Sequence, residues 1–212
     1  MSDSRSGGQE GRSFIETARR AQLVQCAIDT IAEHGYPQAT IARIADRAGV
    51  SRGVVSYHFA GKDELVTQVV TEVFTAGARV MLPAIAAEST AAGKLAAYIR
   101  SNAEFIATHR AYALAMLDIW TSYRTDTGDR LDQAMAAQPP PPELAELDPE
   151  WILRLGMETG EFRTLSARSV AIAVRRAIDG AVLQMSHDPR FDIESYATEL
   201  VTLFDRATKA KG

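Results

Sequence analysis

The apolar residues of this chain recur with the period of an α-helix along almost its whole length. Between Val24 and Ile31 they stand at i, i+3, i+4 and i+7, and no run shows the alternation typical of a half-buried strand. Caps, glycines and prolines divide this pattern into expected helices at about 14–34, 40–48, 51–59, 62–81, 89–108, 109–124, 129–137, 148–159, 166–186 and 192–208. Pro83 is expected to end the fourth helix, and Pro139–Pro142 to form an extended connection. The sequence therefore predicts an all-α fold.

Charge is distributed unevenly along the chain. Residues 12–62 carry seven Lys/Arg and four Asp/Glu, whereas the whole protein has a net charge of −4. Attraction to phosphate acts over about 10 Å, so a local basic region can bind nucleic acid on an acidic protein. We expect a Ser/Gly-rich disordered tail at 1–11, a small basic head at 12–60 and a larger helical body at 61–212.

Composition argues against several other classes of protein. Hydrophobic residues make up 46% and charged residues 24%, as in ordinary globular domains. We see no signal peptide and no apolar run approaching the ~18 residues of a membrane span, so we expect a cytoplasmic protein. Cys26 is alone, and the four histidines show no metal-ligand spacing. No phosphate-binding loop or paired nucleophile can be named, so we expect no metal, no cofactor and no enzyme.

Two short expected helices are joined through Ala48-Gly49-Val50 and follow a longer one, which is the pattern of a helix-turn-helix. The run from Thr40 to Phe59, with Ala-Gly-Val-Ser at its centre, Tyr-His-Phe at its end and a trailing Gly-Lys, closely resembles the head of the TetR family. This resemblance implies that 12–60 is a helix-turn-helix DNA-binding domain. It also implies that 61–212 is a helical domain for ligand binding and dimerisation.

The second short helix offers side chains suited to reading DNA. Ser51 can cap this helix, Arg52 can donate two hydrogen bonds to guanine, and Gly53 allows close approach of the backbone. Val54 and Val55 add shape, and one of them can touch a thymine methyl group. By the family resemblance, phosphate contacts fall to Thr40, Tyr57, His58 and Lys62, with Arg43 as a further candidate.

Several of these residues have an alternative role that does not involve DNA. Tyr57 and Phe59 can be core aromatics, and Phe59 is assigned to the core. Arg52 can be a solvated surface charge. Many family members carry an aromatic residue at the position of Ser56, so this chain departs from the family pattern there.

The body resembles the family more weakly, mainly at Gly160-Glu161-Phe162-Arg163. In TetR-like proteins the last two helices form a four-helix interface with those of a second subunit. The residues that this likeness assigns to a dimer interface are Val170, Val174, Ala177, Ala181, Leu200 and Phe204. Packing within one chain is the alternative for the same apolar stripe.

One expected helix of the body carries a face of mixed aromatic, sulfur and polar side chains, a composition typical of small-molecule pockets. The expected lining residues are His109, Tyr112, Met116, Trp120 and Tyr123, followed by Phe105, Trp151 and Leu155. Arg154 or Glu158 could anchor a polar group. The alternative is an ordinary core stripe.

These features together predict a homodimeric TetR-type repressor that binds double-stranded, palindromic operator DNA and is released by a small, mostly apolar effector. The alternative is a helical nucleoid-associated or partner-binding protein with no ligand response.

Overall fold

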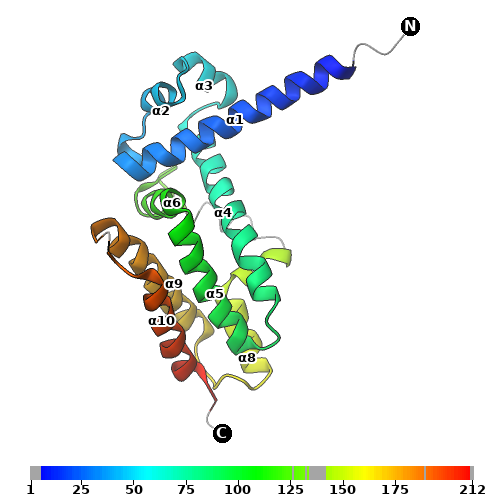
Figure 1. Cartoon of the computed structure of the whole chain (residues 1–212), viewed down its shortest axis with the longest axis vertical. Coiled ribbons are helices and arrows are strands. Elements are labelled where there is room, and N and C mark those ends of the chain that lie inside the picture. Colours follow the sequence, from blue (N-terminus) through cyan, green and yellow to red (C-terminus); the bar gives the residue numbers. More distant parts are fainter. Residues whose placement is uncertain (1–5, 126, 132, 134–141, 189, 211–212) are drawn as a thin grey trace.

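The computed structural model describes residues 6–125, 127–131, 133, 142–188 and 190–210 (Figure 1). Its elements are, in order, α1 (Ser6–His34), the 3₁₀ helix η1 (Tyr36–Gln38), α2 (Ile41–Ala48), α3 (Arg52–His58), α4 (Lys62–Ala86), α5 (Ala91–Thr108), α6 (Arg110–Ser122), the 3₁₀ helix η2 (Pro142–Leu147), α8 (Pro149–Glu158), α9 (Ala167–His187) and α10 (Ile193–Thr208). Extended pairing in this part of the chain is limited to isolated bridges, Arg124 with Arg130 and Phe162 with Lys209. The predicted all-α fold is confirmed.

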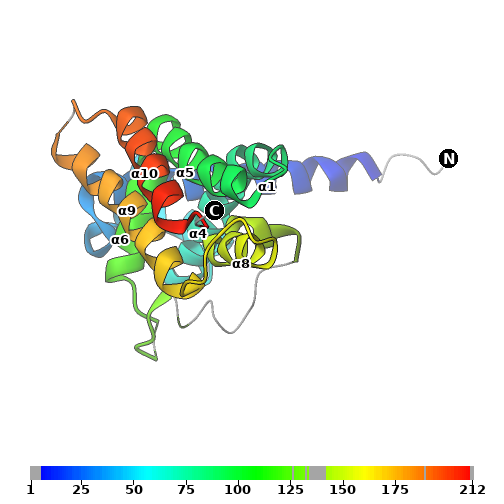
Figure 2. The ribbon, with the colours of Figure 1, turned by 90° about the horizontal axis from the view of Figure 1, so that it is seen from below.

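The molecule has a head and a body, connected by α4. In Figure 1, α2 and α3 lie beside α1 at one end, and α4 runs from this head down along the body. Seen from below in Figure 2, α5, α8, α9 and α10 are grouped together while the first turns of α1 project to one side. The amino end therefore lies at the head and the carboxyl end at the far tip of the body.

Local signals explain the two short helices of the head. The Thr40 hydroxyl oxygen accepts a hydrogen bond from the Arg43 N–H at 3.3 Å and so caps α2. Gly49 ends α2 with φ of 67°, in the left-handed region that glycine adopts without strain. Ser51 precedes α3 as expected, but its side chain makes no capping hydrogen bond, which corrects the role given to it from sequence.

The head has a closely packed hydrophobic core. Leu23 and Ile28 of α1, Ile44 of α2, Val55 of α3 and Phe59 are each no more than 2% exposed. This confirms the assignment of Phe59 to the core. The same cluster continues along α4 as far as Ala76 and takes in Ala115 and Ile119 of α6. Its packing thus runs across the expected division between residues 60 and 61.

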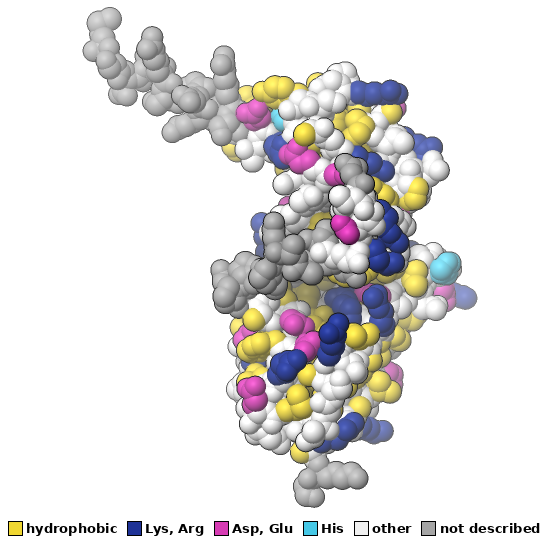
Figure 3. Space-filling view, turned by 180° about the vertical axis from the view of Figure 1, so that it is seen from behind, with side chains coloured by type: hydrophobic (Ala, Val, Ile, Leu, Met, Phe, Trp, Pro, Cys, Tyr) yellow, Lys and Arg dark blue, Asp and Glu magenta, His cyan; other side chains and the backbone are white. Residues whose placement is uncertain are grey.

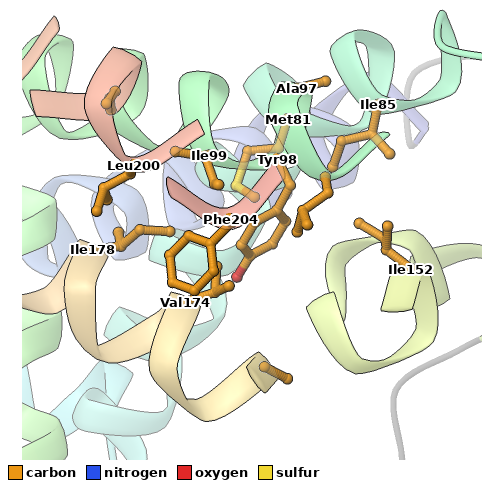
Figure 4. Close-up of a cluster of buried hydrophobic side chains, with 14 of the residues drawn as sticks. Met81, Ile85, Ala97, Tyr98, Ile99, Ile152, Val174, Ile178, Leu200 and Phe204 are labelled. Atoms are coloured by element: carbon orange, nitrogen blue, oxygen red, sulfur yellow. The ribbon is translucent and has the colours of Figure 1, made fainter. Parts of the chain in front are cut away.

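A second core fills the body, where α5 packs against α8, α9 and α10. Figure 4 shows Tyr98 of α5 reaching toward Val174 of α9, beside Phe204 of α10. At the end of α8, a Cβ atom added to Gly156 would lie 2.1 Å from the Phe162 ring, so only glycine fits there. The Gly160-Glu161-Phe162-Arg163 segment thereby closes this end of the body.

Several expected boundaries differ from the structure. α1 begins at Ser6, so part of the expected tail is helical. α4 continues through Pro83 to Ala86, because Pro83 lies on an exposed side where water can bond the carbonyl that it leaves unpaired. Most of the expected helix 129–137 and residues 139–141 fall outside the described residues.

α4 is also long and apolar enough to span a membrane, with a mean hydropathy of 1.4 over 18 residues. Its buried valines instead pack in the core of the head, and Met81 and Ile85 pack in the core of the body.

Candidate DNA-binding surface and ligand cavity

The helix α3 presents one face to the core and the other to solvent. Arg52 and Gly53 are exposed in its first turn, and the Tyr57 side chain is 74% exposed near its end. Val55 is only 1% exposed and packs in the head core. This corrects the assignment of Val55 as a DNA contact, because the helical period turns this position inward. Val54 is half-buried.

Arg20 of α1 holds the end of α3 in place. Its guanidinium donates to the His58 carbonyl, pairs with Glu64 at 3.1 Å and lies 4.3 Å from the centre of the Phe59 ring. The Ala60 N–H donates to Glu64 at 2.7 Å, and this bond, with that from Arg20, lowers the pKa of the Glu64 carboxyl. The outer face of α3 is therefore presented on a fixed support.

The expected phosphate contacts lie in different environments. Arg43 and Thr40 are exposed at the start of α2. Lys62 is half-buried: its ammonium donates to the Tyr36 carbonyl at 2.9 Å and lies 3.9 Å from the centre of the Tyr36 ring. Burial lowers the pKa of Lys62. Lys62 thus joins α4 to η1, and its contact with phosphate stays a prediction. Figure 3 shows Lys and Arg side chains along one side of the head.

The body contains a partly open cavity of about 370 Å³ between α4, α5, α6 and α9, with the segment Leu147–Pro149 at the start of α8 as a further part of its lining. From the residues expected to line a pocket, the structure brings together Phe105, Met116 and Trp120. The sequence reasoning missed the wall from α4, which includes Phe74 and Met81, and the polar side chains on α5 and α9. Those residues lie far apart in the sequence, so no local pattern could group them.

Five expected pocket residues do not line this cavity. His109 stacks on Phe105 with ring centres 4.9 Å apart, and the Tyr112 hydroxyl donates to Gln25 of α1 at 2.7 Å. Tyr123 is buried against the head core. Trp151 and Leu155 pack against the core of the body.

These five placements correct the expectation of a single lining face on α6. Met116 and Trp120 face the cavity, whereas Tyr112 of the same helix contacts α1. The suggested polar anchor Arg154 is exposed and pairs with Glu150 instead.

The residues expected at a dimer interface are mostly used inside one chain. Val174, Ala181, Leu200 and Phe204 are each no more than 9% exposed and belong to the core of the body. This corrects their assignment, because a buried side chain has no surface left for a partner. Val170 and Ala177 are half-buried.

Different apolar side chains of the last two helices are exposed to solvent. Their exposed fractions are 53% for Ile172 and 49% for Leu183 on α9, and 58% for Leu203 on α10. The expected pattern could not separate these two sets, because helices that meet within a chain and between chains use the same spacing.

An exposed recognition-type helix on a packed head, together with a hollow helical body, defines a helix-turn-helix protein with a ligand-sized cavity. Residues 23–69 match the family model described as "Bacterial regulatory proteins, tetR family". The head of this chain therefore belongs to the TetR family.

Sequence relatives agree over part of the chain. The transcriptional regulator BetI of Cronobacter sakazakii is 32% identical over 114 residues, which cover 51% of this chain and 54% of that protein. Across the BetI relatives compared, the matched segment spans between 29% and 56% of their length. The likeness to these relatives therefore extends over about half of the chain at most.

Solved structures share the fold over most of the chain. FadR from Bacillus subtilis, in complex with stearoyl-CoA, has a TM-score of 0.71 at 22% identity and covers 86% of this chain and 96% of its own. A transcriptional regulator from Saccharomonospora viridis, in complex with choline, has a TM-score of 0.67 at 19% identity, covering 92% and 100%. At these identities the likeness describes the fold.

Proposed function

We propose that this chain is a cytoplasmic, homodimeric transcriptional repressor that binds a palindromic operator and is released by a small, mostly apolar ligand. The observation that carries the proposal is the solvent-facing side of α3, with Arg52 exposed in its first turn on a head matched to the TetR family. An α-helix of this kind fits the major groove and reads bases from its first turn. We assign no catalytic activity, since the matched family and relatives are described as regulators.

The test of DNA reading compares two arginine variants on the DNA beside the protein's own gene. Arg52→Ala is expected to weaken operator binding by about 1–3 kcal/mol, the value of one two-bond base contact, and to relax sequence preference. Arg154→Ala removes an exposed arginine from the body and is expected to leave binding unchanged. Footprinting and a salt series measure both effects. Equal binding to all sequences by the unaltered protein would instead support a nucleoid-associated role.

The exposed apolar side chains Ile172, Leu183 and Leu203 support dimerisation through α9 and α10. Two recognition helices could then reach half-sites about 34–36 Å apart, or somewhat more. Leu203→Glu is expected to yield a folded monomer that binds operator weakly, because the charge would be buried without a partner at the interface. Ile15→Glu on α1, an equally apolar and 67% exposed position, is the control. Sedimentation that still shows a dimer for Leu203→Glu would place the interface elsewhere.

Ligand binding can reach the head through α6. Met116 and Trp120 line the cavity, and between them the Asp118 carboxylate accepts a hydrogen bond from the Tyr36 N–H. The Tyr36 ring packs edge to face against the Tyr123 ring, and the Tyr36 carbonyl accepts a hydrogen bond from Lys62 at the start of α4. A ligand that shifts α6 therefore acts on the contacts that hold the head. A coupling of about 1–3 kcal/mol would change operator affinity some 5- to 150-fold.

A further inference from the structure

The walls of the cavity differ in polarity. α4 and α6 contribute apolar side chains. α5 and α9 contribute the polar side chains Tyr98, Asn102, Arg175, Arg176 and Asp179, beside the apolar Phe105, Ile106 and Val182. A ligand that fills this space therefore meets an apolar surface on one side and hydrogen-bonding groups on the other.

The acidic groups of the lining are already engaged. The Asp179 carboxylate accepts from Arg175 at 3.1 Å and from Arg176 at 3.0 Å, so one negative charge serves two guanidinium groups. The other lining acid, Asp148, accepts from the Glu150 N–H at 2.9 Å and caps α8. On α9 itself, two guanidinium groups therefore share one carboxylate, and the second negative charge of the lining lies on Asp148 at the start of α8.

The remaining polar groups are mostly donors. Arg175 donates to the Tyr98 hydroxyl at 3.2 Å and to the Asn102 side-chain oxygen at 3.4 Å. Among the described residues, no hydrogen bond uses the Nη2 group of Arg175 or the hydroxyl proton of Tyr98. Desolvation opposes the charge of Arg175, but Tyr98 and Asp179 outweigh it and raise its pKa. The unused Nη2 group of Arg175 and the unused hydroxyl proton of Tyr98 suit a ligand that brings acceptor oxygens.

We propose that the effector is an amphipathic carboxylate whose carboxylate binds Arg175 and Tyr98 while its apolar part lies against Phe105, Met116 and Trp120. This inference rests on the proposed function, because it concerns the ligand of the same cavity. A quaternary ammonium fits less well, since it requires a free carboxylate or an aromatic cage, and both lining acids are engaged.

The test uses three probes with the same ten-carbon chain: decanoate, decyltrimethylammonium and 1-decanol, each below its micelle concentration. Binding to the full-length protein is measured by calorimetry and by Trp fluorescence. Decanoate is expected to bind at least about tenfold more tightly than either of the others, the ratio that a charge-assisted hydrogen bond provides. Equal or tighter binding of the cation or the alcohol, or binding of none of the three, overturns the proposal. Operator binding by the same sample reports separately on the proposed function.

Two variants test which residues cause the preference for decanoate over decanol. Tyr98→Phe removes one hydroxyl from an otherwise unchanged ring and is expected to weaken decanoate a few-fold, about 2- to 10-fold, with no effect on decanol. Arg175→Gln is expected to abolish the advantage of decanoate over decanol. Arg154→Gln, outside the cavity, is the matched control. A decanoate preference that survives both cavity variants places the carboxylate elsewhere and also overturns the proposal.

Discussion

The head and the body of this protein are built from the same kind of helix but are packed differently. In the head, Leu23, Ile28, Ile44 and Leu65 are at most 2% exposed around a closely packed core. In the body, side chains such as Leu117 and Trp120 are half-buried at a cavity of about 370 Å³. A surface that reads DNA needs fixed geometry, whereas a ligand site needs space. The two requirements are met in different regions of one chain: the head is closely packed and the body contains the cavity. The helices α4 and α6 contribute to both regions.

The largest effect is expected from shortening a core side chain of the head. Ile44→Ala should lower the free energy of unfolding by about 2–5 kcal/mol, because it leaves a cavity in a packed region. Leu117→Ala removes a side chain of similar size from the wall of an existing cavity and should cost less than half as much. Urea unfolding at one fixed protein concentration measures both. Similar losses for the two variants would show that the body is packed as closely as the head.

Enlarging a side chain should give the same ranking of tolerance, head below body, at two positions of a single helix. Ala115 of α6 is fully buried in the head core, while Ala113 of the same helix lines the cavity. Ala115→Leu is expected to destabilise the fold by about 1–3 kcal/mol through overpacking. Ala113→Leu should change stability little and reduce the space open to ligands. Thermal unfolding compares the pair, and a larger loss for Ala113→Leu would contradict the division between packed and hollow regions.

The link between the two regions can be loosened at Asp118. Asp118→Ala removes the acceptor of the Tyr36 N–H, so the Tyr36 amide should exchange with solvent faster, by about tenfold or more. The amide of Ile44 in the head core should keep its protection. Hydrogen exchange followed by NMR measures both. Unchanged exchange at Tyr36 would mean that other contacts hold α6 to the head.

The smallest effect is expected at the closing segment of the body. The N–H groups of Ala91 and Ala92, at the start of α5, donate to the Glu161 carboxylate at 3.1 Å, and these bonds lower its pKa. A lowered folded-state pKa adds stability above the unfolded value, about 4.3, and this gain is lost as pH falls through the folded pKa. Glu161→Gln should therefore cost less than about 1 kcal/mol at pH 7.

The cost of Glu161→Gln should shrink as pH falls below the unfolded pKa of about 4.3 and vanish once pH is below the lowered folded-state pKa. Exposed Glu158→Gln is the control for loss of a surface charge. Chemical unfolding at pH 7 and at low pH compares the two variants. A cost that persists at low pH would assign the effect to packing and not to the charge of Glu161.

Sequence and structure agree best where contacts are local. The bounds of α2 and α3 follow from Thr40, Gly49 and Ser51, and the inward position of Phe59 follows from its apolar character at the end of α3. The cavity could be predicted only in part, because its walls come from helices distant in sequence. Phe105, Met116 and Trp120 were expected there, but Arg175 was not, since a charged residue on a helix usually faces solvent.

The residues assigned to a dimer interface are wrong for a related reason. Ala181 and Leu200 have the small or apolar side chains that suit close helix packing, but the structure uses them between helices of one chain. Periodicity tells which side of a helix is apolar and not which neighbour covers it.

The division of α4 between two cores sets where this protein could be recombined with others. Residues Leu65 to Ala76 of α4 complete the head core, and Met81 and Ile85 belong to the core of the body. A head excised at Ala60 would lose the valines of α4, would expose the apolar residues of α1 that α4 normally covers, and would be prone to aggregate. A chimera that gives this head a new sensor should therefore keep α4 through Ala76 and place the junction before Met81. The unit of exchange is the head with half of its connecting helix.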